Sequence, residues 1–407
     1  MEIGNCTMML RQDTDNLRLE IKGRIDSTNA ENVYSKVNLM RKQRPGGDVI
    51  FDCEGLEYIS SAGLRILLMV QKKEPEKIKL INVSQEVNGI LDLTGFSELF
   101  DISVALRDIS NLEVRKLGTS GSIALYATND DNLLKVYSHD TSQDVIEKER
   151  NYARAAFMCG VPTLIPYDIV KYNGCYGMLY EFPKATTVSA LIGTSILKVD
   201  QYAREMGKFL KTLHSCRPEQ DALPDIHNIF EGYALKMSQW FNNQEVRTLL
   251  GIIRSIPPCG TFVYGEFHPR SVFMQHGELL VIDMSGIGYG NPIYDLGTAY
   301  MNHVLAPETQ IKRVTGLDAA QAKKFWQVML RSYLDTDDDN MVQECETPIR
   351  VTALLRYALS PAIRPMTNEE IEKCVDQARS DIFPKADELM NQLASMNEYI
   401  YYMPYDD

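Results

Sequence analysis

Residues 262–286, FVYGEFHPRSVFMQHGELLVIDMSG, constrain the fold more than any other part of this chain. The apolar run LLVI ends at Asp283, and Met-Ser-Gly follows directly. This pattern predicts a buried strand that places one carboxylate beside a flexible glycine. A single Asp at a strand end is usually a turn residue. Its meaning therefore depends on the groups that other segments bring to it.

The chain is 407 residues long, more than one compact core usually holds, so we expect two or three domains. Hydrophobic residues make up 44% and charged residues 24%, which predicts a chain that folds. The net charge is -13, and Lys and Arg form no long block. Both observations argue against nucleic acid as a partner.

The cysteine pattern and the N-terminus bear on the compartment. Eight cysteines are scattered without a C-x-x-C pair, which favours reduced thiols over a disulfide framework or a zinc site. The first residues lack a basic start followed by an apolar core, and no window approaches the roughly 18 apolar residues of a membrane span. We expect a cytoplasmic protein with no membrane partner.

Residues 1–108 alternate between strand and helix patterns and predict an α/β domain with a mixed sheet. The expected strands include LRLEIKG (17–23), DVIFDC (48–53) and IKLINV (78–83). Thr28 and Glu31 offer a capping box for a helix over AENVYSKVNLMRK. A second helix is expected to bury Leu64, Leu67, Leu68 and Met69.

Ser60 and Ser61 stand between an apolar strand and the start of that second helix. Four backbone N–H groups lack partners at a helix start, and the helix dipole is positive there. A serine at this position is most often a simple cap. The same place best tolerates an added phosphate, whose charge of roughly -1.5 to -2 would face those donors.

Three segments of the N-terminal domain resemble the signature segments of STAS domains, the fold of bacterial anti-sigma factor antagonists. These segments are IKGRIDSTNAENV, IFDCEGLEYISSAGLRILL and LDLTGFSELFDI. In that family a partner kinase phosphorylates the first Ser of an Asp-Ser-Ser/Thr-Gly-Leu turn. The resemblance implies that Ser61 is the phosphorylated residue, although Ser60 stands at the Asp and Ala62 at the second hydroxyl residue. It also implies a protein partner such as an anti-sigma factor or a kinase.

Residues 109–407 predict a second domain of the α+β class with two lobes. Its small lobe, 113–183, combines a mainly antiparallel sheet with one long helix over 142–160, and Asn173-Gly174 signals a hairpin. The large lobe, 184–407, is expected to be mostly helical. Helical spacing is clearest at 201–216 and at Phe325, Val328, Met329 and Tyr333.

A lysine in the small lobe is expected to need a partner. Lys135 lies in the apolar strand NLLKVY, where a charge is costly unless it is paired or reaches solvent. Glu149 falls on or beside the buried face of the next helix, so we expect a Lys135–Glu149 ion pair, with Glu147 as the exposed alternative. The residues expected to mark that buried face are Val145, Ile146, Tyr152 and Ala156.

These residues match the few parts that phosphoryl transfer requires of a protein: a phosphate loop, a paired Lys, metal ligands and a base. Gly118 and Gly121, in LGTSGS, allow close approach of backbone to phosphates. The backbone at Glu181 and Phe182 is placed to hydrogen-bond a nucleotide base. Asp283 is suited to a magnesium ion.

The ensemble resembles the aminoglycoside phosphotransferase and choline kinase branch of the protein kinase-like fold, from about residue 113 to at least 300. The most specific block is 264–297, which is similar to the family's His-Gly-Asp-Phe-His-Pro-x-Asn, Ile-Asp and Pro-x-x-Asp-Leu elements. The resemblance implies ATP and Mg²⁺ as cofactors. It assigns nucleotide binding to Lys135 and Glu149, metal binding to Asp283, a structural role to Asp295 and the Leu-His helix segment to His214.

Three departures fall on the chemistry. Tyr264 stands at the His, Glu266 at the catalytic Asp and Ser271 at the metal-binding Asn. Glu266 keeps the charge but moves it by one methylene, and a misplacement of about 1 Å can cost roughly a hundredfold in rate. Ser271 offers one hydroxyl oxygen to the metal, a poorer ligand than a carbonyl.

These changes favour a signalling protein in which a nucleotide-binding pseudokinase regulates the STAS domain. The first alternative is an active phosphotransferase that uses Glu266 as base. Its acceptor would be a small hydroxylated molecule or Ser61 of the same chain. The second alternative is an interaction scaffold that binds no nucleotide.

Overall fold

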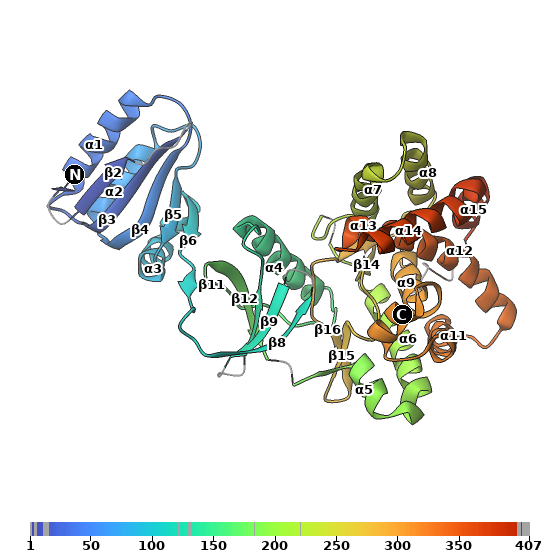
Figure 1. Cartoon of the computed structure of the whole chain (residues 1–407). Coiled ribbons are helices and arrows are strands. Elements are labelled where there is room, and N and C mark those ends of the chain that lie inside the picture. The colour runs from blue at the N-terminus through green and yellow to red at the C-terminus, as the bar shows by residue number, and fades with distance from the viewer. Residues whose placement is uncertain are drawn as a thin grey trace. The chain divides into compact units, whose positions relative to one another are not determined.

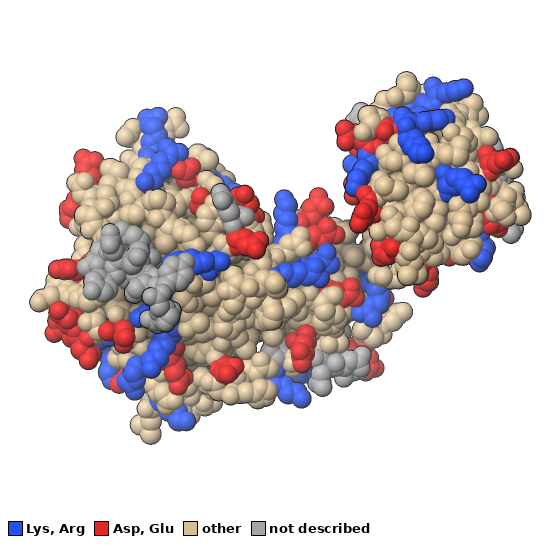
Figure 2. Space-filling model, turned by 180° about the vertical axis from the view of Figure 1, so that it is seen from behind, with Lys and Arg blue, Asp and Glu red and all other residues tan. Residues whose placement is uncertain are grey.

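The computed structural model describes residues 2–3, 6–10, 16–120, 123–128, 132–182, 184–219, 221–396 and 400. Contacts divide the chain into two compact units, Met1–Asp108 and Ile109–Asp407, each with its own hydrophobic core (Figure 1). Among the described residues, no helix is both long and apolar enough to cross a membrane. On the face shown in Figure 2, acidic and basic side chains are interspersed, and large areas carry neither.

The first unit is a mixed sheet in the order β1-β2-β3-β4-β5-β6. β2 is antiparallel to β3, whereas β3, β4, β5 and β6 run parallel. The strands of this unit are β1 (Glu2–Ile3), β2 (Cys6–Leu10), β3 (Leu17–Ile25), β4 (Val49–Ile59), β5 (Lys79–Val83), β6 (Asp101–Val104) and β7 (Arg107–Asp108). Its helices are α1 (Ala30–Gln43), α2 (Ser61–Gln71), α3 (Gln85–Leu93) and the short η1 (Phe96–Glu98).

Two local expectations for this unit are wrong. The N-cap of α1 is Asn29, whose side chain makes no capping bond, and the Thr28 hydroxyl instead donates to Asp26 Oδ1 at 2.6 Å. The capping box of Thr28 and Glu31 is therefore absent, because Asp26 competes for the threonine. In α2 the buried face is formed by Leu64, Ile66, Leu67 and Val70. Met69 is 39% exposed because the helical period turns it outward.

The second unit begins with a small lobe built on an antiparallel sheet, in the order β11-β12-β10-β9-β8. Its strands are β8 (Val114–Ser120), β9 (Ile123–Thr128), β10 (Asn132–Val136), β11 (Asp168–Tyr172) and β12 (Cys175–Glu181). The predicted hairpin at Asn173-Gly174 is confirmed, with φ of 50° and 77°. Both angles suit an Asn-Gly turn.

One helix, α4 (Gln143–Met158), packs against β12 of this sheet. Its buried face carries Ile146, Glu149, Ala153 and Ala156. The expectation that Val145 faces the sheet is wrong, since its side chain is 53% exposed. The buried face of α4 is centred on Ile146 rather than on Val145, and this places Glu149 on the buried side.

The large lobe is mostly helical, as predicted (Figure 1). Its helices are α5 (Val188–Thr194), η2 (Ile196–Lys198), α6 (Val199–Ser215), α7 (Ile226–Lys236), η3 (Met237–Gln239), α8 (Asn243–Arg254), α9 (Ile293–Tyr300), the π-helix η4 (Met301–Leu305), α10 (Glu308–Thr315), α11 (Ala319–Leu334), α12 (Asp339–Ala358), α13 (Ser360–Ile363), α14 (Asn368–Asp381), η5 (Phe383–Lys385) and α15 (Ala386–Ala394). Its short strands are β13 (Thr186–Thr187), β14 (Thr261–Val263), β15 (Val272–Gln275), β16 (Glu278–Val281) and β17 (Gly288–Gly290). They form two small sheets, β13-β15-β16 and β14-β17.

Close packing of α6 on α11 depends on Gly207. A Cβ at this position would collide with the carbonyl oxygen of Met329 and lie 2.9 Å from Ser332 Cβ. Gly207 thus lets the backbones of α6 and α11 approach each other closely. A Cβ on Gly232 in α7 would instead enter open space, with no described atom within 4 Å, so this glycine offers a matched control.

We predict that Gly207→Ala destabilises the protein by about 1–3 kcal/mol, because an added methyl overpacks the α6–α11 seam. Gly232→Ala should leave stability unchanged or raise it by roughly 0.5–1 kcal/mol, through the better helix propensity of alanine. Thermal melts of both variants beside the wild type check this. Equal melting temperatures for the two variants would contradict the packing argument.

Candidate functional site

A buried ion pair lies between the small-lobe sheet and α4. Lys135 of β10 is 4% exposed and Glu149 of α4 is 6% exposed, and Lys135 Nζ lies 2.5 Å from Glu149 Oε1. The Tyr137 hydroxyl donates to the second carboxylate oxygen, Glu149 Oε2, at 2.9 Å. The predicted Lys135–Glu149 ion pair is therefore present. Tyr137 was missed, although it stands two residues along the strand on the same side as Lys135.

The same ammonium group reaches a carboxylate of the large lobe. Asp283 follows β16, and its Oδ1 accepts from Lys135 Nζ at 3.0 Å and from the backbone N–H of Ser285 at 3.1 Å. Burial disfavours charge on both partners, yet their mutual attraction outweighs it. As a result the pKa of Asp283 is lowered and the pKa of Lys135 is raised. The site holds one ammonium between two carboxylates, and the Asp283 side chain is half-exposed.

The loop between β14 and β15 is hydrogen-bonded to Asp295 of α9. The fully buried Asp295 carboxylate accepts the backbone N–H of Tyr264 at 2.7 Å and that of Gly265 at 2.6 Å. His214 Nε2 lies 3.2 Å from the same carboxylate, and its Nδ1 lies 2.9 Å from the Tyr333 hydroxyl. Asp295 and His214 thus fix the loop backbone.

Gly265 is required by the path of this loop. Its φ is +82°, and a Cβ here would collide with the carbonyl oxygen of Gly286, in the segment after Asp283. A side chain is therefore excluded by both conformation and space. The loop that carries Glu266 and the loop that follows Asp283 are in backbone contact.

Glu266 is engaged by a residue that sequence reasoning missed. Arg356 of α12 forms an ion pair with Glu266 Oε1 through Nη2. The Arg356 side chain is 7% exposed, whereas that of Glu266 is 46% exposed. The other oxygen, Oε2, lies 3.9 Å from His268 Nε2. The available signal was an arginine inside the apolar run VTALLRYALS, which needs a partner for the reason that Lys135 does.

Ser271 is turned into the loop. Its hydroxyl donates to the Glu266 carbonyl oxygen at 2.5 Å and accepts the backbone N–H of His268 at 3.1 Å. The Ser271 N–H in turn donates to His268 Nδ1 at 3.1 Å. The hydroxyl therefore closes the turn, and binding a metal through it would require these bonds to rearrange.

Of the remaining predicted nucleotide contacts, Gly118 and Glu181 lie on strands of the small lobe. Gly118 is in β8, beside a register shift against β9, whereas Gly121 lies outside the described residues. Glu181 is the exposed last residue of β12 and pairs with Asn132. Phe182 follows it and is half-buried. The roles proposed for these residues stay predictions.

Ser61 lies in the first unit at the start of α2 and is exposed. Ser60 is the N-cap, and its hydroxyl accepts the N–H of Gly63 at 3.4 Å. Ser60 therefore provides the helix cap, and the neighbouring Ser61 is exposed to solvent. Phosphorylation of Ser61 stays a prediction.

The residues present fit a magnesium ion bound with a nucleotide. Among the described residues, no group of three or more His, Cys, Asp or Glu side chains could hold a metal by itself. Mg²⁺ is commonly bound by one or two carboxylates together with substrate phosphates and water. Asp283, ionised and half-exposed, can serve as that carboxylate, and Lys135 can meet a phosphate oxygen.

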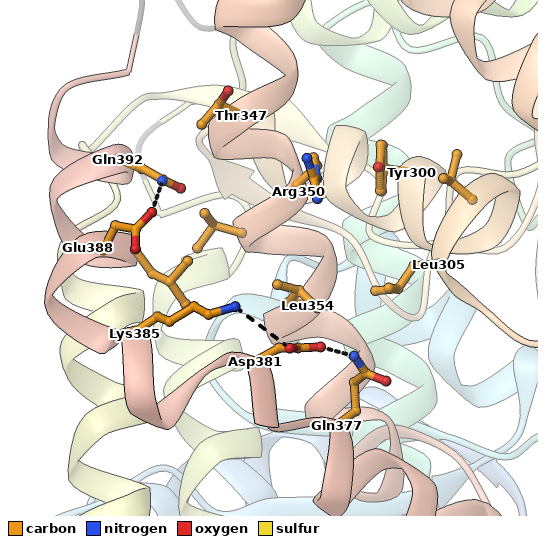
Figure 3. A pocket seen from close by; sticks show the side chains of 13 residues that line it. Tyr300, Leu305, Thr347, Arg350, Leu354, Gln377, Asp381, Lys385, Glu388 and Gln392 are labelled. Atoms are coloured by element: carbon orange, nitrogen blue, oxygen red, sulfur yellow. Dashed lines mark hydrogen bonds and ion pairs between the residues drawn. The ribbon is translucent and has the colours of Figure 1, made fainter. Parts of the chain in front are cut away.

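A separate cavity of about 370 Å³ lies among the C-terminal helices, away from these residues (Figure 3). Its labelled side chains come from η4 and the end of α9, from one side of α12, and from α14, η5 and α15. Both signs of charge line it, with Arg350 and Lys385 as the cations and Asp381 and Glu388 as the anions, and Lys385 Nζ lies 3.9 Å from Asp381 Oδ1. Because α12 also carries Arg356, the helix that lines this cavity is the one that holds Glu266.

We predict that removing one partner of the Lys135–Glu149 pair destabilises the protein by about 3–5 kcal/mol. Without Lys135 the buried Glu149 carboxylate loses its cation, and without the Glu149 charge Lys135 keeps only the half-exposed Asp283 as a counter-charge. Lys135→Met and Glu149→Gln should each lower the melting temperature, and the double variant should lose less than the sum of the two. The pair Arg254–Glu231 at the surface is the control, and we expect its coupling to be much weaker because solvent screens the charges. Additive losses at Lys135 and Glu149 would contradict a coupled buried pair.

Comparison with known proteins agrees with this architecture. The model of the phosphotransferase enzyme family matches residues 112–327, and that of the STAS domain matches residues 7–109. The chain is 26% identical over 102 residues to the anti-sigma-B factor antagonist of Bacillus subtilis (strain 168), which covers 24% of this chain and 92% of that protein.

Solved structures of kinase-like proteins are also similar. The ADP-bound aminoglycoside phosphotransferase APH(2'')-Ib has 17% identity and a TM-score of 0.45, covering 71% of this chain and 95% of its own. A choline/ethanolamine kinase family protein from Mesorhizobium loti has 13% identity and a TM-score of 0.46, covering 70% and 94%. The two resemblances inferred from the sequence are confirmed. The chain belongs to the phosphotransferase enzyme family and carries a STAS domain ahead of its phosphotransferase domain.

Proposed function

We propose that the second unit binds a magnesium–nucleotide complex but transfers phosphate slowly or not at all, and that the bound state regulates the STAS domain. One contrast carries this proposal. The groups that would hold a nucleotide are assembled, with Lys135 between Glu149 and Asp283. The group that would activate an acceptor, Glu266, is engaged by Arg356.

The assembled groups support binding. Lys135 is held charged by two carboxylates, so an ammonium group is in place for a phosphate oxygen. Asp283 offers a carboxylate to the metal, and bound Mg²⁺ would neutralise charge on the phosphates. Glu149, fixed by Tyr137, orients the lysine. These residues need no large rearrangement before a ligand binds.

The ion pair of Glu266 with Arg356 and the hydrogen bonds of the Ser271 hydroxyl within its own loop support slow phosphate transfer. A catalytic base must approach the proton that it accepts to within hydrogen-bond distance. Oε1 of Glu266 already bonds a buried guanidinium, and the hydroxyl of Ser271 is bonded within the loop. An acceptor hydroxyl would have to displace Arg356 or approach Oε2, which faces His268.

The regulated output is proposed from the first unit. Its B. subtilis relative is an anti-sigma factor antagonist, and the present STAS domain would act in the same way on a protein partner such as an anti-sigma factor. In this scheme the protein is a signalling component whose nucleotide state changes the availability of the STAS surface. Ser61, exposed at the start of α2, is the site at which phosphate would alter that surface.

A second function, active phosphotransfer, is favoured by one observation. The Glu266 side chain keeps its charge and is 46% exposed, while Asp295 preserves the backbone of the loop. Glu266 would then serve as the base through Oε2. The acceptor would be a small hydroxylated molecule or Ser61.

We predict that ATP with Mg²⁺, at about 100 times its dissociation constant, raises the melting temperature by about 5 °C. Lys135→Ala should abolish this shift because it removes the phosphate-binding ammonium. Lys171→Ala, which removes an exposed lysine from β11 of the same sheet, should retain it. Absence of a shift in wild type would overturn nucleotide binding and favour the scaffold function.

We predict that the double variant Glu266→Asp/Ser271→Asn gains ATP turnover of up to about a hundredfold over wild type, because it restores the shorter carboxylate and the amide ligand. Radiolabelled ATP with the full chain measures turnover and label on protein. Adding Asp283→Asn to the double variant should remove the gain and exclude a contaminating ATPase. Label on wild-type protein that is lost in Ser61→Ala would instead establish active transfer in cis.

A further inference from the structure

Two cysteines from different lobes meet at the ends of two helices. Cys159 is the C-cap of α4, and Cys216 is the C-cap of α6. Their thiols are close enough for each to shift the pKa of the other. Each sulfur also lies near a carbonyl oxygen of its own helix, Cys159 Sγ at 3.2 Å from Ala156 and Cys216 Sγ at 3.5 Å from Thr212. The contact joins segments that are far apart in sequence.

Packing around the pair confirms that the two chain segments touch. A Cβ placed on Gly160, the residue after Cys159, would lie 3.9 Å from Cys216 Sγ. Gly160 has φ of +95°, and this left-handed residue turns the chain out of α4 at the contact. Cys159 packs against the hydrophobic cluster that includes Cys216. The sulfurs are thus held together by both backbones and by the core.

The two thiols differ in access and in acidity. Cys159 is partly exposed, whereas Cys216 is 8% exposed. The interaction with Cys216 lowers the pKa of Cys159 to about 7, although burial opposes this. The same interaction raises the pKa of Cys216. Cys159 therefore ionises more readily than Cys216, and the thiolate is the form that reacts.

We propose that Cys159 and Cys216 are a redox-active pair that closes to a reversible disulfide when a hydroperoxide reaches Cys159. The Cys159 thiolate attacks the peroxide O–O bond and, with one proton, gives a sulfenic acid and water for hydrogen peroxide. The Cys216 thiol then attacks the sulfenic sulfur, which forms the S–S bond and releases a second water. The two thiols are oxidised by two electrons and the peroxide is reduced by two, and a small dithiol or thiol reverses the step.

Three buried cysteines elsewhere in the chain are much less acidic than Cys159. Burial raises the pKa of Cys53 to about 12 and that of Cys345 and Cys374 to about 11, which keeps their thiols protonated and slow to react. Cys175 on β12 is partly exposed and serves as an accessible control. The reaction should therefore be selective for the pair.

The disulfide would tie the end of α4 to the end of α6. Because α4 carries Glu149, the bond would fix the partner of Lys135 relative to the large lobe. Oxidation would thus act on the small lobe through the C-terminal end of α4. This inference does not depend on whether a nucleotide binds.

The test treats the reduced full chain with stoichiometric hydrogen peroxide and maps disulfides by non-reducing peptide mass spectrometry. We expect one intramolecular peptide pair joining Cys159 to Cys216, loss of two free thiols, a melting temperature higher by several degrees, and full reversal by dithiothreitol. Cys175→Ser should behave as wild type. Oxidation that stops at a sulfinic acid, or bonds that involve other cysteines or a second chain, would overturn the proposal.

Order of reaction provides a second readout. Cys216→Ser should accumulate a sulfenic acid at Cys159 that dimedone captures, whereas Cys159→Ser should leave Cys216 unmodified at the same peroxide dose. Dimedone labelling at Cys216 with Cys159 unlabelled would contradict the assigned roles. If a serine at the buried position 216 prevents folding, Cys216→Ala replaces it, and the wild-type peptide map decides by itself.

Discussion

The buried charge of Lys135 is the constraint on which the second unit depends. An ammonium group deep in a protein costs several kcal/mol unless it is paired. Here the pairing comes from both lobes, with Glu149 on a small-lobe helix and Asp283 on a large-lobe strand end. The requirement to satisfy one cation therefore brings together the elements that a phosphate ligand would contact. In the proposed function, stability and ligand binding would depend on the same three groups.

Two separate helices contact the loop that carries Glu266. From α9, Asp295 accepts two backbone N–H groups and fixes the loop's shape. From α12, Arg356 holds the Glu266 side chain. The shape of the loop and the position of its acidic side chain are thus held by different helices.

Much of this could be predicted from local sequence. Lys135 was found because a charge in an apolar strand needs a partner, and Glu149 because helical spacing turned it inward. The spacing of apolar residues locates the buried face of a helix only to within about one residue. For this reason Val145 and Met69 were predicted to be buried although both are exposed. Arg356 was missed because its partner lies 90 residues away, and no local pattern relates the two. The thiol contact of Cys159 and Cys216 likewise arises from tertiary packing alone.

Backbone contact between Gly265 and Gly286 couples the loop that carries Glu266 directly to the loop that follows Asp283. A shift of either strand would be passed directly to the other, since no side chain lies between them to absorb it. Glu266 and Asp283 are therefore carried on one connected backbone frame. Substitutions at the site must act by exchanging side-chain length and chemistry on a fixed frame, and the replacements at positions 264, 266 and 271 are changes of that kind.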